Sequence, residues 1–127
     1  MEPKVRPAKA ADLPGIAGIY NHAILNSTAT FDVEPWDAVR QRRWLREHAH
    51  PYAVIVAVDG EEVLGWASLS PFRTKAAYLY TAENSVYVRD DLRGNGIGRL
   101  LLARLLEVAA ENGFHTIIAG SSGDSPA

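Results

Sequence analysis

A glycine-rich run places the strongest constraint on what this chain can fold into. The run Arg93-Gly94-Asn95-Gly96-Ile97-Gly98 lies between a β-prone segment and a leucine-rich segment. Glycines at alternate positions let the backbone approach a ligand closely and turn its N–H groups to one side. A helix that starts there adds N–H groups without intrahelical partners and a partial positive charge. The run therefore predicts a phosphate-binding loop, with Arg93 and Arg99 at its rim.

The segments around this loop alternate between strand and helix patterns. Residues 53–58 form a continuous β-prone run, and Asp59-Gly60 separates it from a second apolar run at 63–69. Asp-Gly between two such runs predicts a β-hairpin. The order β-α-α-β-β-β-α-β predicts an α+β domain, a mixed sheet flanked by helices. Further strands are expected at 5–8, 78–88 and 116–119.

Three helices are expected. Asp12 is placed to cap the first helix, because Leu13 and Pro14 follow it and proline fits a first turn. The third helix follows the glycine run and is expected to end at Gly113, a residue type that favours the position just after a helix. Its inward row is expected to be Leu101, Leu102, Leu105, Leu106 and Ala109. The second helix covers about 35–48, and its solvated face is expected to hold Arg40, Arg42, Arg43 and Arg46.

Composition excludes several functional classes. The 127 residues contain no cysteine, which excludes disulfides, thiolate catalysis and cysteine-ligated metal centres. A formal charge of −2 argues against a general nucleic-acid binder. His48 and His50 beside Glu47 have a spacing that suits convergent metal ligands poorly, so no metal is expected. The N-terminus lacks the apolar core of a signal peptide and no apolar run could cross a bilayer, so we expect a cytoplasmic protein without a membrane partner.

The glycine run also differs from two common phosphate loops. Its G-x-G-x-G spacing is not the G-x-G-x-x-G of dinucleotide folds, and it lacks the G-K-[ST] of a nucleotide P-loop. The pattern Arg-x-x-Gly-x-Gly between a strand and a helix resembles the coenzyme A pyrophosphate loop of the GNAT superfamily, the GCN5-related N-acetyltransferases. A glycine-rich turn that only caps a helix is the alternative reading.

A longer stretch sharpens the resemblance. Residues 81–98, TAENSVYVRDDLRGNGIG, resemble the phosphinothricin and methionine sulfoximine N-acetyltransferases, as do Tyr20-Asn21, Gly65-Trp66-Ala67 and Phe72-Arg73. The resemblance implies the GNAT acyl-CoA N-acyltransferase fold, acetyl-CoA as co-substrate and a homodimer. It implies direct attack by the substrate amine in a ternary complex, without an acyl-enzyme. The implied acceptor is a small amino acid or analogue such as phosphinothricin or methionine sulfoximine.

The resemblance also implies site residues. Glu83 is the candidate general base, because a carboxylate near the amine can take its proton, directly or through a water; an exposed strand glutamate is the alternative. Backbone groups of Val86, Tyr87 and Val88 are expected to hold the pantetheine arm and thioester, with the Val88 N–H as a candidate oxyanion donor. Arg73 is expected to pair with a carboxylate or phosphinate of the acceptor. The acceptor site as a whole is expected to hold Phe31, Phe72, Arg73, Thr74 and Glu83.

Other functions stay open. A module that binds acyl-CoA with little or no transfer would keep the glycine loop and lack the acceptor site. An acetyltransferase for another amine, such as a polyamine, an antibiotic or a protein N-terminus, would share the same loop. His22 on the first helix is a possible second acid or base, although a surface histidine is the commoner reading.

The end of the chain departs from the resembled pattern. There the family continues with a further helix and a closing pair of strands, whereas residues 120–127 read GSSGDSPA, with Asp124 where an asparagine is expected. An uncovered strand at 116–119 would be an apolar edge, which soluble proteins normally avoid. We therefore expect residues 1–127 to be a single N-acetyltransferase domain that is incomplete at its C-terminus. If the chain is complete, strand exchange or a tight oligomer is expected to bury that edge.

Overall fold

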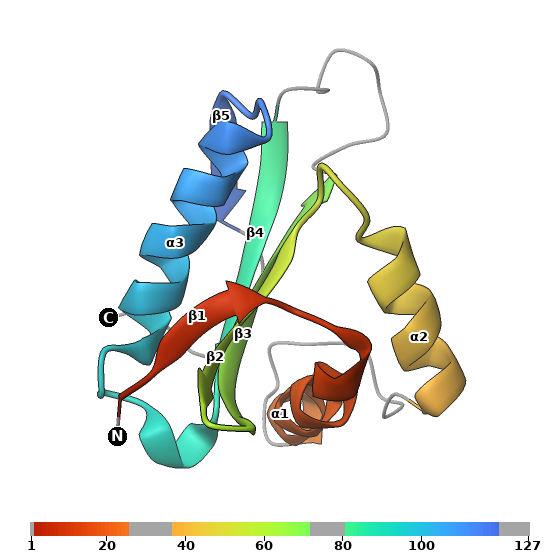
Figure 1. Ribbon diagram of the computed structural model, residues 1–127, viewed down its shortest axis with the longest axis vertical. Helices are drawn as coiled ribbons and strands as arrows, with labels where there is room; N and C mark the ends of the chain where they lie inside the picture. Colours follow the sequence, from red (N-terminus) through yellow and green to blue (C-terminus); the bar gives the residue numbers. More distant parts are fainter. Residues whose placement is uncertain (1, 26–36, 72–80, 120–127) are drawn as a thin grey trace.

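The described strands form one mixed sheet. The computed structural model describes residues 2–25, 37–71 and 81–119. Its strands, shown in Figure 1, are β1 (Lys4–Pro7), β2 (Val54–Asp59), β3 (Glu62–Pro71), β4 (Thr81–Val88) and β5 (Thr116–Ala119). They lie in the order β1-β2-β3-β4-β5, antiparallel throughout except for the parallel pair β4–β5. The predicted α+β class and element order are confirmed.

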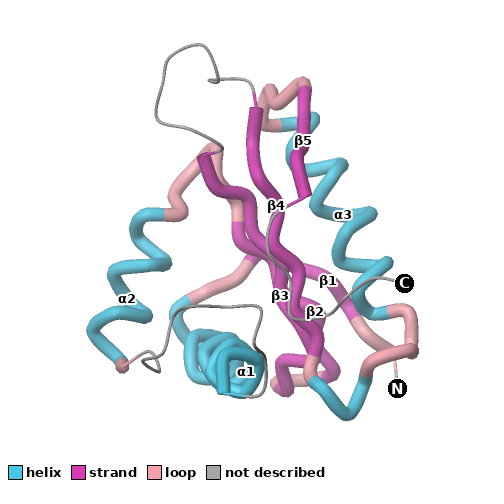
Figure 2. Tube along the Cα trace, turned by 180° about the vertical axis from the view of Figure 1, so that it is seen from behind, coloured by secondary structure: helices cyan, strands magenta, loops and turns pink. Residues whose placement is uncertain are grey.

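Helices cover both faces of this sheet. They are α1 (Leu13–Leu25), α2 (Ala38–Glu47) and α3 (Ile97–Glu111), with the 3₁₀ turns η1 (Ala10–Asp12) and η3 (Asp90–Leu92). α3 lies on one face, and α1 and α2 lie on the other, as the two opposite views show (Figures 1 and 2). In the part of the chain that the structure describes, no helix is both long and apolar enough to cross a membrane.

The predicted hairpin forms the centre of the sheet. Gly60 occupies its turn with a φ of +63°, which glycine adopts at no steric cost. β2 is buried over Val54–Val58 and β3 over Val63–Leu69. Both strands therefore have neighbours on each edge and cover on each face, which explains why they read as continuous apolar runs.

α3 packs closely on the sheet through one row of side chains. Leu101, Leu105 and Ala109 are at most 1% exposed and belong to the same core cluster. A Cβ at Gly65 would stand 2.9 Å from the carbonyl oxygen of Tyr87 and 3.0 Å from a methyl carbon of Leu101. Glycine at this position therefore allows α3 to approach the strands.

The predicted inward row of α3 is wrong at Leu102 and Leu106. Leu106 is 45% exposed and Leu102 is only half-buried. The fully buried row begins one turn earlier, at Ile97, and continues at every fourth residue through Leu101 and Leu105. Residues one position beyond that row lie about 100° around the helix from it, and at 102 and 106 they are less buried.

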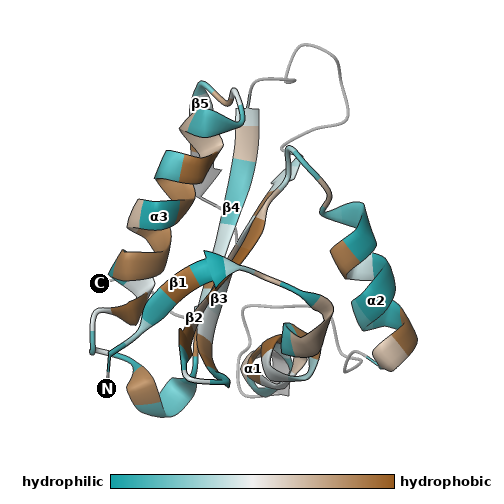
Figure 3. Ribbon diagram, viewed as in Figure 1, coloured by the Kyte–Doolittle hydropathy of each residue, from teal (hydrophilic) through white to brown (hydrophobic). Residues whose placement is uncertain are grey.

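α2 is shorter than predicted because Asp37 caps it. The Asp37 carboxylate accepts a hydrogen bond from the backbone N–H of Arg40 at 2.8 Å, so the helix begins at Ala38. Figure 3 shows hydrophilic residues over much of this helix. Arg42, Arg43 and Arg46 are exposed as expected, whereas Arg40 is half-buried.

The end of α3 confirms the prediction for Gly113. Its φ is +90°. The N–H of Gly113 donates to Ala110 at 3.2 Å, and the N–H of Phe114 donates to Ala109 at 3.0 Å. These two bonds are the Schellman arrangement, which satisfies the last carbonyls of the helix. Phe114 then packs in the same cluster as Ala109, so the chain turns directly into β5.

Asp12 does not cap α1 as the sequence predicted. Its carboxylate instead stabilises the turn that precedes the helix. Its carboxylate accepts two hydrogen bonds from the Arg6 guanidinium, at 2.7 and 2.8 Å, and one from the Lys9 N–H at 2.8 Å. Asp12 is 4% exposed. The hydrogen bonds from Arg6 lower the pKa of this carboxyl. The pair ties β1 to the start of α1 across η1.

We predict that this pair makes stability depend on pH. A carboxyl whose pKa is lowered by folding stabilises the fold above its unfolded pKa, about 3.9, and loses that contribution as the pH falls through the lower folded pKa. Asp12→Asn should therefore lower the unfolding free energy at pH 7 by about 1–3 kcal/mol, and the difference should shrink below pH 4. Urea unfolding at several pH values measures this. Asp59→Asn in the hairpin turn, where Asn-Gly is equally suitable, should leave the curve unchanged; a pH-independent loss for Asp12→Asn would contradict the prediction.

Candidate active site

The glycine loop begins after β4 and ends in the first turn of α3. Gly94 and Gly96 have φ values of +86° and +79°, and a Cβ added at either would meet no described atom within 4 Å. Gly96 is the N-cap of α3. The N–H groups of Ile97, Gly98 and Arg99 in the first turn have no acceptor inside the helix. The predicted loop therefore combines open space above its backbone with donors that suit an anion.

The other loop residues define its turn and its rim. The backbone N–H and the Nδ2 of Asn95 both donate to the carbonyl of Leu92, at 3.3 and 3.0 Å. Arg93 is 43% exposed and its guanidinium lies 3.5 Å from the Asp90 carboxylate. Arg99 is exposed. Both predicted rim arginines are therefore accessible to an anion at the loop.

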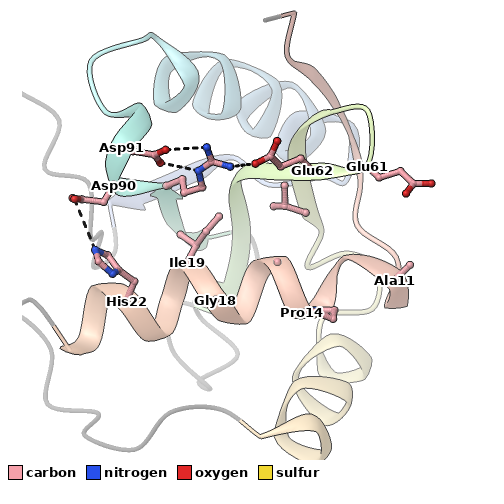
Figure 4. A pocket seen from close by; sticks show the side chains of 12 residues that line it. Ala11, Pro14, Gly18, Ile19, His22, Glu61, Glu62, Asp90 and Asp91 are labelled. Carbon is pink, nitrogen blue, oxygen red and sulfur yellow. Dashed lines mark hydrogen bonds and ion pairs between the residues drawn. The ribbon is translucent and has the colours of Figure 1, made fainter.

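Arg89 ties this loop to the central hairpin (Figure 4). Its Nε and Nη2 donate to the two carboxylate oxygens of Asp91 at 2.7 and 2.9 Å, and its Nη1 donates to Glu62. These hydrogen bonds raise the pKa of the guanidinium and hold the pKa of Asp91 below its usual value. The backbone N–H of Arg89 donates to Leu64 at 2.9 Å. A bidentate pair fixes direction as well as distance, so η3 and the loop start from a defined position.

The two edges of β4 differ. One edge pairs with β3 along Ala82–Val88. The other edge pairs with β5 over Thr81–Asn84 among the described residues, and Figure 2 shows β5 beside part of β4. Beyond Asn84, β4 continues without a described partner strand on that edge.

The ladder with β3 sets which backbone groups face that edge. Hydrogen-bonded pairs recur at every second residue of an antiparallel ladder, and the bond from Arg89 to Leu64 gives the phase. The N–H and C=O of Tyr87 therefore point to β3. Those of Val86 and Val88 point to the edge beyond the β5 pairing. Among the three predicted backbone residues, only Tyr87 has its groups directed into the sheet.

Side chains on β4 alternate between the two faces. Val88 belongs to the core under α3, whereas Tyr87 belongs to the cluster that α1 packs against. The Tyr87 ring stacks on Trp66 at 4.9 Å and meets Tyr20 edge-on at 5.6 Å. Burial raises the pKa of the Tyr87 phenol. By the same alternation, Glu83 shares the face of α1 and α2 with Tyr87.

Sequence reasoning missed two polar neighbours of this face. Glu83 is half-buried, and Ser70 of β3 lies directly opposite it in register. The Oγ of Ser70 lies 3.2 Å from Nε2 of His48, and Nδ1 of the same ring lies 2.9 Å from the carbonyl of Trp44. Only the strand register and the position of α2 bring these residues together, so no local pattern could have indicated them.

His22 lies elsewhere. It lines a cavity of about 700 Å³ between α1, the hairpin turn and η3, and its Nε2 is 3.8 Å from the Asp90 carboxylate (Figure 4). Arg89 lines the same cavity. Since residues 83–89 span about 20 Å of extended strand, His22 is distant from Glu83 and is not part of its surroundings.

The remaining predicted acceptor residues lie outside the described part of the chain. These are Phe31, Phe72, Arg73 and Thr74. For the acceptor side, the structure therefore describes Glu83 and the residues around it. Their roles, and that of Asp124, stay predictions.

Comparison with known proteins connects these features to one family. Residues 16–126 match the Acetyltransferase (GNAT) family. An L-methionine sulfoximine/L-methionine sulfone acetyltransferase of Pseudomonas aeruginosa is 43% identical over 121 residues, which cover 94% of this chain and 70% of the relative. A phosphinothricin N-acetyltransferase of Streptomyces coelicolor is 41% identical over 123 residues, with 94% and 72% covered.

Solved structures agree with this result. A GNAT superfamily phosphinothricin acetyltransferase from Sinorhizobium meliloti, solved in complex with AcCoA, superposes with a TM-score of 0.86 at 36% identity. The match covers 94% of this chain and 65% of that one. Fold, glycine loop and sequence thus lead to the same assignment: the chain belongs to the GNAT family of acetyl-CoA-dependent N-acetyltransferases.

Proposed function

We propose that this protein transfers the acetyl group of acetyl-CoA to the amine of a small amino acid or analogue of the methionine sulfoximine or phosphinothricin type. The observation that carries the proposal is the continuity of β4, the glycine loop and α3. This continuity places the edge of β4, which suits the extended pantetheine arm of the coenzyme, in line with the glycine loop, which suits the coenzyme's phosphates. The names of the relatives at 43% and 41% identity support the acceptor class.

The coenzyme would be held mainly by backbone. The first-turn N–H groups of α3, with Gly94 and Gly96, suit the pyrophosphate, and Arg93 and Arg99 add charge at the rim. The N–H and C=O directions of Val86 and Val88 suit an extended pantetheine arm beside β4. When bound, acetyl-CoA supplies an activated acetyl group with a thiolate as leaving group.

Glu83 would act on the amine. Attack requires a neutral amine, and a carboxylate can take the proton of an ammonium group. About 16 Å of extended strand separates Glu83 from Val88. If the Val88 N–H stabilises the developing oxyanion, a single water does not span that separation, and Glu83 would take the proton through a chain of hydrogen-bonded waters. The donor and the base come from one strand, so their separation is fixed by its geometry.

We also propose that residues 1–127 belong to a single N-acetyltransferase domain, and that the protein works as a homodimer in the cytoplasm. The domain proposal is supported by the shared sheet, in which strands from both ends of the chain pair with the same hairpin and its neighbour β4. Light scattering of the purified protein tests the dimer.

Thiol release from acetyl-CoA tests the function directly. Methionine sulfoximine and phosphinothricin should give acceptor-dependent release, whereas a polyamine, an aminoglycoside and an N-terminal peptide should give little. Binding of acetyl-CoA without release for any acceptor would favour an acyl-CoA-binding module. Thiol release with only one of the other amines would show that this amine is the acceptor and that the amino acid analogue is not.

We predict that Gly96→Ala weakens acetyl-CoA binding at least tenfold. The new Cβ would occupy the open space where phosphate must approach the backbone. Because φ at Gly96 is +79°, the substitution also costs about 1–2 kcal/mol of backbone strain. Gly60→Ala is the matched control, since Gly60 has a φ of +63° and equally open surroundings. Calorimetry should show weakened binding for Gly96→Ala alone; equal affinity in both variants would refute the loop assignment.

We predict that Glu83→Gln slows acetyl transfer roughly 10²–10⁴-fold, the usual contribution of a general base. The amide keeps the shape of the side chain but takes no proton, so acetyl-CoA affinity should change little. Glu61→Gln, at an exposed position of the hairpin turn, serves as the control. Turnover of Glu83→Gln at the wild-type rate would leave Glu83 with a structural role only.

A further inference from the structure

We infer that Ser70 and His48 form a proton relay behind Glu83, in which His48 is the final acceptor of the proton taken from the amine. The inference rests on the proposed role of Glu83 as the general base. An imidazole is ordinarily a stronger base than a carboxylate, by about two pKa units. Catalysis by a base is most effective when its pKa lies near the operating pH. A histidine in proton contact with Glu83 would therefore improve the removal of a proton from an ammonium group.

The sheet register brings the first two members together. Ser70 and Glu83 are direct partners on β3 and β4. Partners in an antiparallel pair project to the same face, with Cβ atoms about 4.5–5.5 Å apart. That face is the one that α1 and α2 cover. Both residues are half-buried, so each is partly shielded from water, and the register makes them direct cross-strand neighbours.

The hydrogen bonds of His48 define the direction of the relay. A carbonyl oxygen can only accept, so the 2.9 Å contact between Trp44 and Nδ1 places a hydrogen on Nδ1. In the neutral ring, Nε2 is then an acceptor, and the Ser70 hydroxyl donates to it across 3.2 Å. The hydroxyl hydrogen points to His48, and the lone pairs of Ser70 are left to receive a proton from Glu83.

Aromatic contacts hold the imidazole in place. The His48 ring lies 4.6 Å from the Trp44 ring, and Trp44 meets Trp66 edge-on at 5.3 Å. Trp66 is 3% exposed and lies on β3, on the same face as Ser70. The end of α2 is therefore packed on the strand that carries Ser70. His48 itself is only half-buried, so the imidazolium can release its proton to solvent.

The transfer balances without any added reagent. The ammonium group gives one proton, through the intervening waters, to the Glu83 carboxylate. The resulting carboxylic acid gives that proton to Ser70 Oγ as the Ser70 hydroxyl hydrogen moves to Nε2 of His48. Glu83 is again a carboxylate, Ser70 again a hydroxyl, and His48 an imidazolium that loses its proton to water. Because His48 and Ser70 act through Glu83, they are positioning residues.

The competing explanation is that the contact between His48 and Ser70 only docks α2 on β3. His48→Gln separates the two, since glutamine can still bond to Ser70 but cannot take up a proton. We expect kcat at neutral pH to fall roughly 10- to 100-fold, less than for loss of the base itself. The KM values and the melting temperature should stay near those of the wild type. His50→Gln is the matched control, because His50 lies two residues away and is exposed.

Variants of Ser70 test the middle of the relay. Ser70→Ala should lower kcat as much as His48→Gln, and the double variant should be no slower than either, since both changes interrupt one path. Ser70→Thr retains a hydroxyl and should keep most of the activity. Additive losses, or equal losses in the alanine and threonine variants, would overturn the relay.

Chemical rescue distinguishes proton transfer from packing. In His48→Ala, added imidazole should restore kcat in proportion to its concentration, and should have no effect on Ser70→Ala. If imidazole restores nothing and the melting temperature falls together with kcat, His48 is a packing contact and the inference is wrong. Glu83→Gln keeps the outcomes separate. A slow Glu83→Gln beside fast His48 and Ser70 variants rejects only the relay, whereas a fast Glu83→Gln rejects the base assignment itself.

Discussion

The unequal pairing of β4 is the constraint on which the candidate site depends. β3 bonds to it along Ala82–Val88, which fixes its twist and the phase of its backbone groups. The described part of β5 pairs with it over Thr81–Asn84, on the other edge. A strand paired along both edges would leave no backbone groups for the pantetheine arm of the coenzyme. A strand without partners would have no fixed orientation of its backbone groups. Within the described residues, β4 thus has a long ladder with β3 and a short one with β5.

Three anchors keep this strand in position. β3 is buried on both faces over Val63–Leu69, and Gly65 lets α3 approach this strand closely. The aromatic contact between Trp66 and Tyr87 joins β3 to β4 on the opposite face. Arg89 then joins the end of β4 to the hairpin turn and to η3. Charged contacts of this exposure contribute little to overall stability, so the contribution of Arg89 lies in geometry.

Most of the fold could be predicted from the sequence because its signals are local. The Asp59-Gly60 turn, the glycine at 113 and the apolar runs each depend on neighbouring residues, and each prediction is confirmed. The errors occur where distant residues decide. Asp12 bonds to Arg6 of another element, and Leu106 is exposed because it lies one position beyond the buried row of α3.

The candidate site shows the same difference between local signals and contacts made by distant residues. The glycine loop is a contiguous motif, so its position and its conformation could be predicted together. The environment of Glu83 could not, because strand register sets Ser70 opposite it and the packing of α2 sets His48 against Ser70. Likewise, a motif that lists Val86, Tyr87 and Val88 equally does not show that the ladder directs the groups of Tyr87 into the sheet.

The alternation along β4 also bears on how such an enzyme can diverge. Side chains at odd positions such as Glu83 face α1 and α2, while the backbone groups of even positions such as Val88 point away from β3. In the proposed function, the acceptor meets side chains, which substitution changes, and the coenzyme arm meets backbone, which substitution leaves in place. New acceptor preferences can therefore arise at odd positions without loss of the coenzyme. On β4, the backbone groups that would hold the coenzyme are thus separate from the side chains that would select the acceptor.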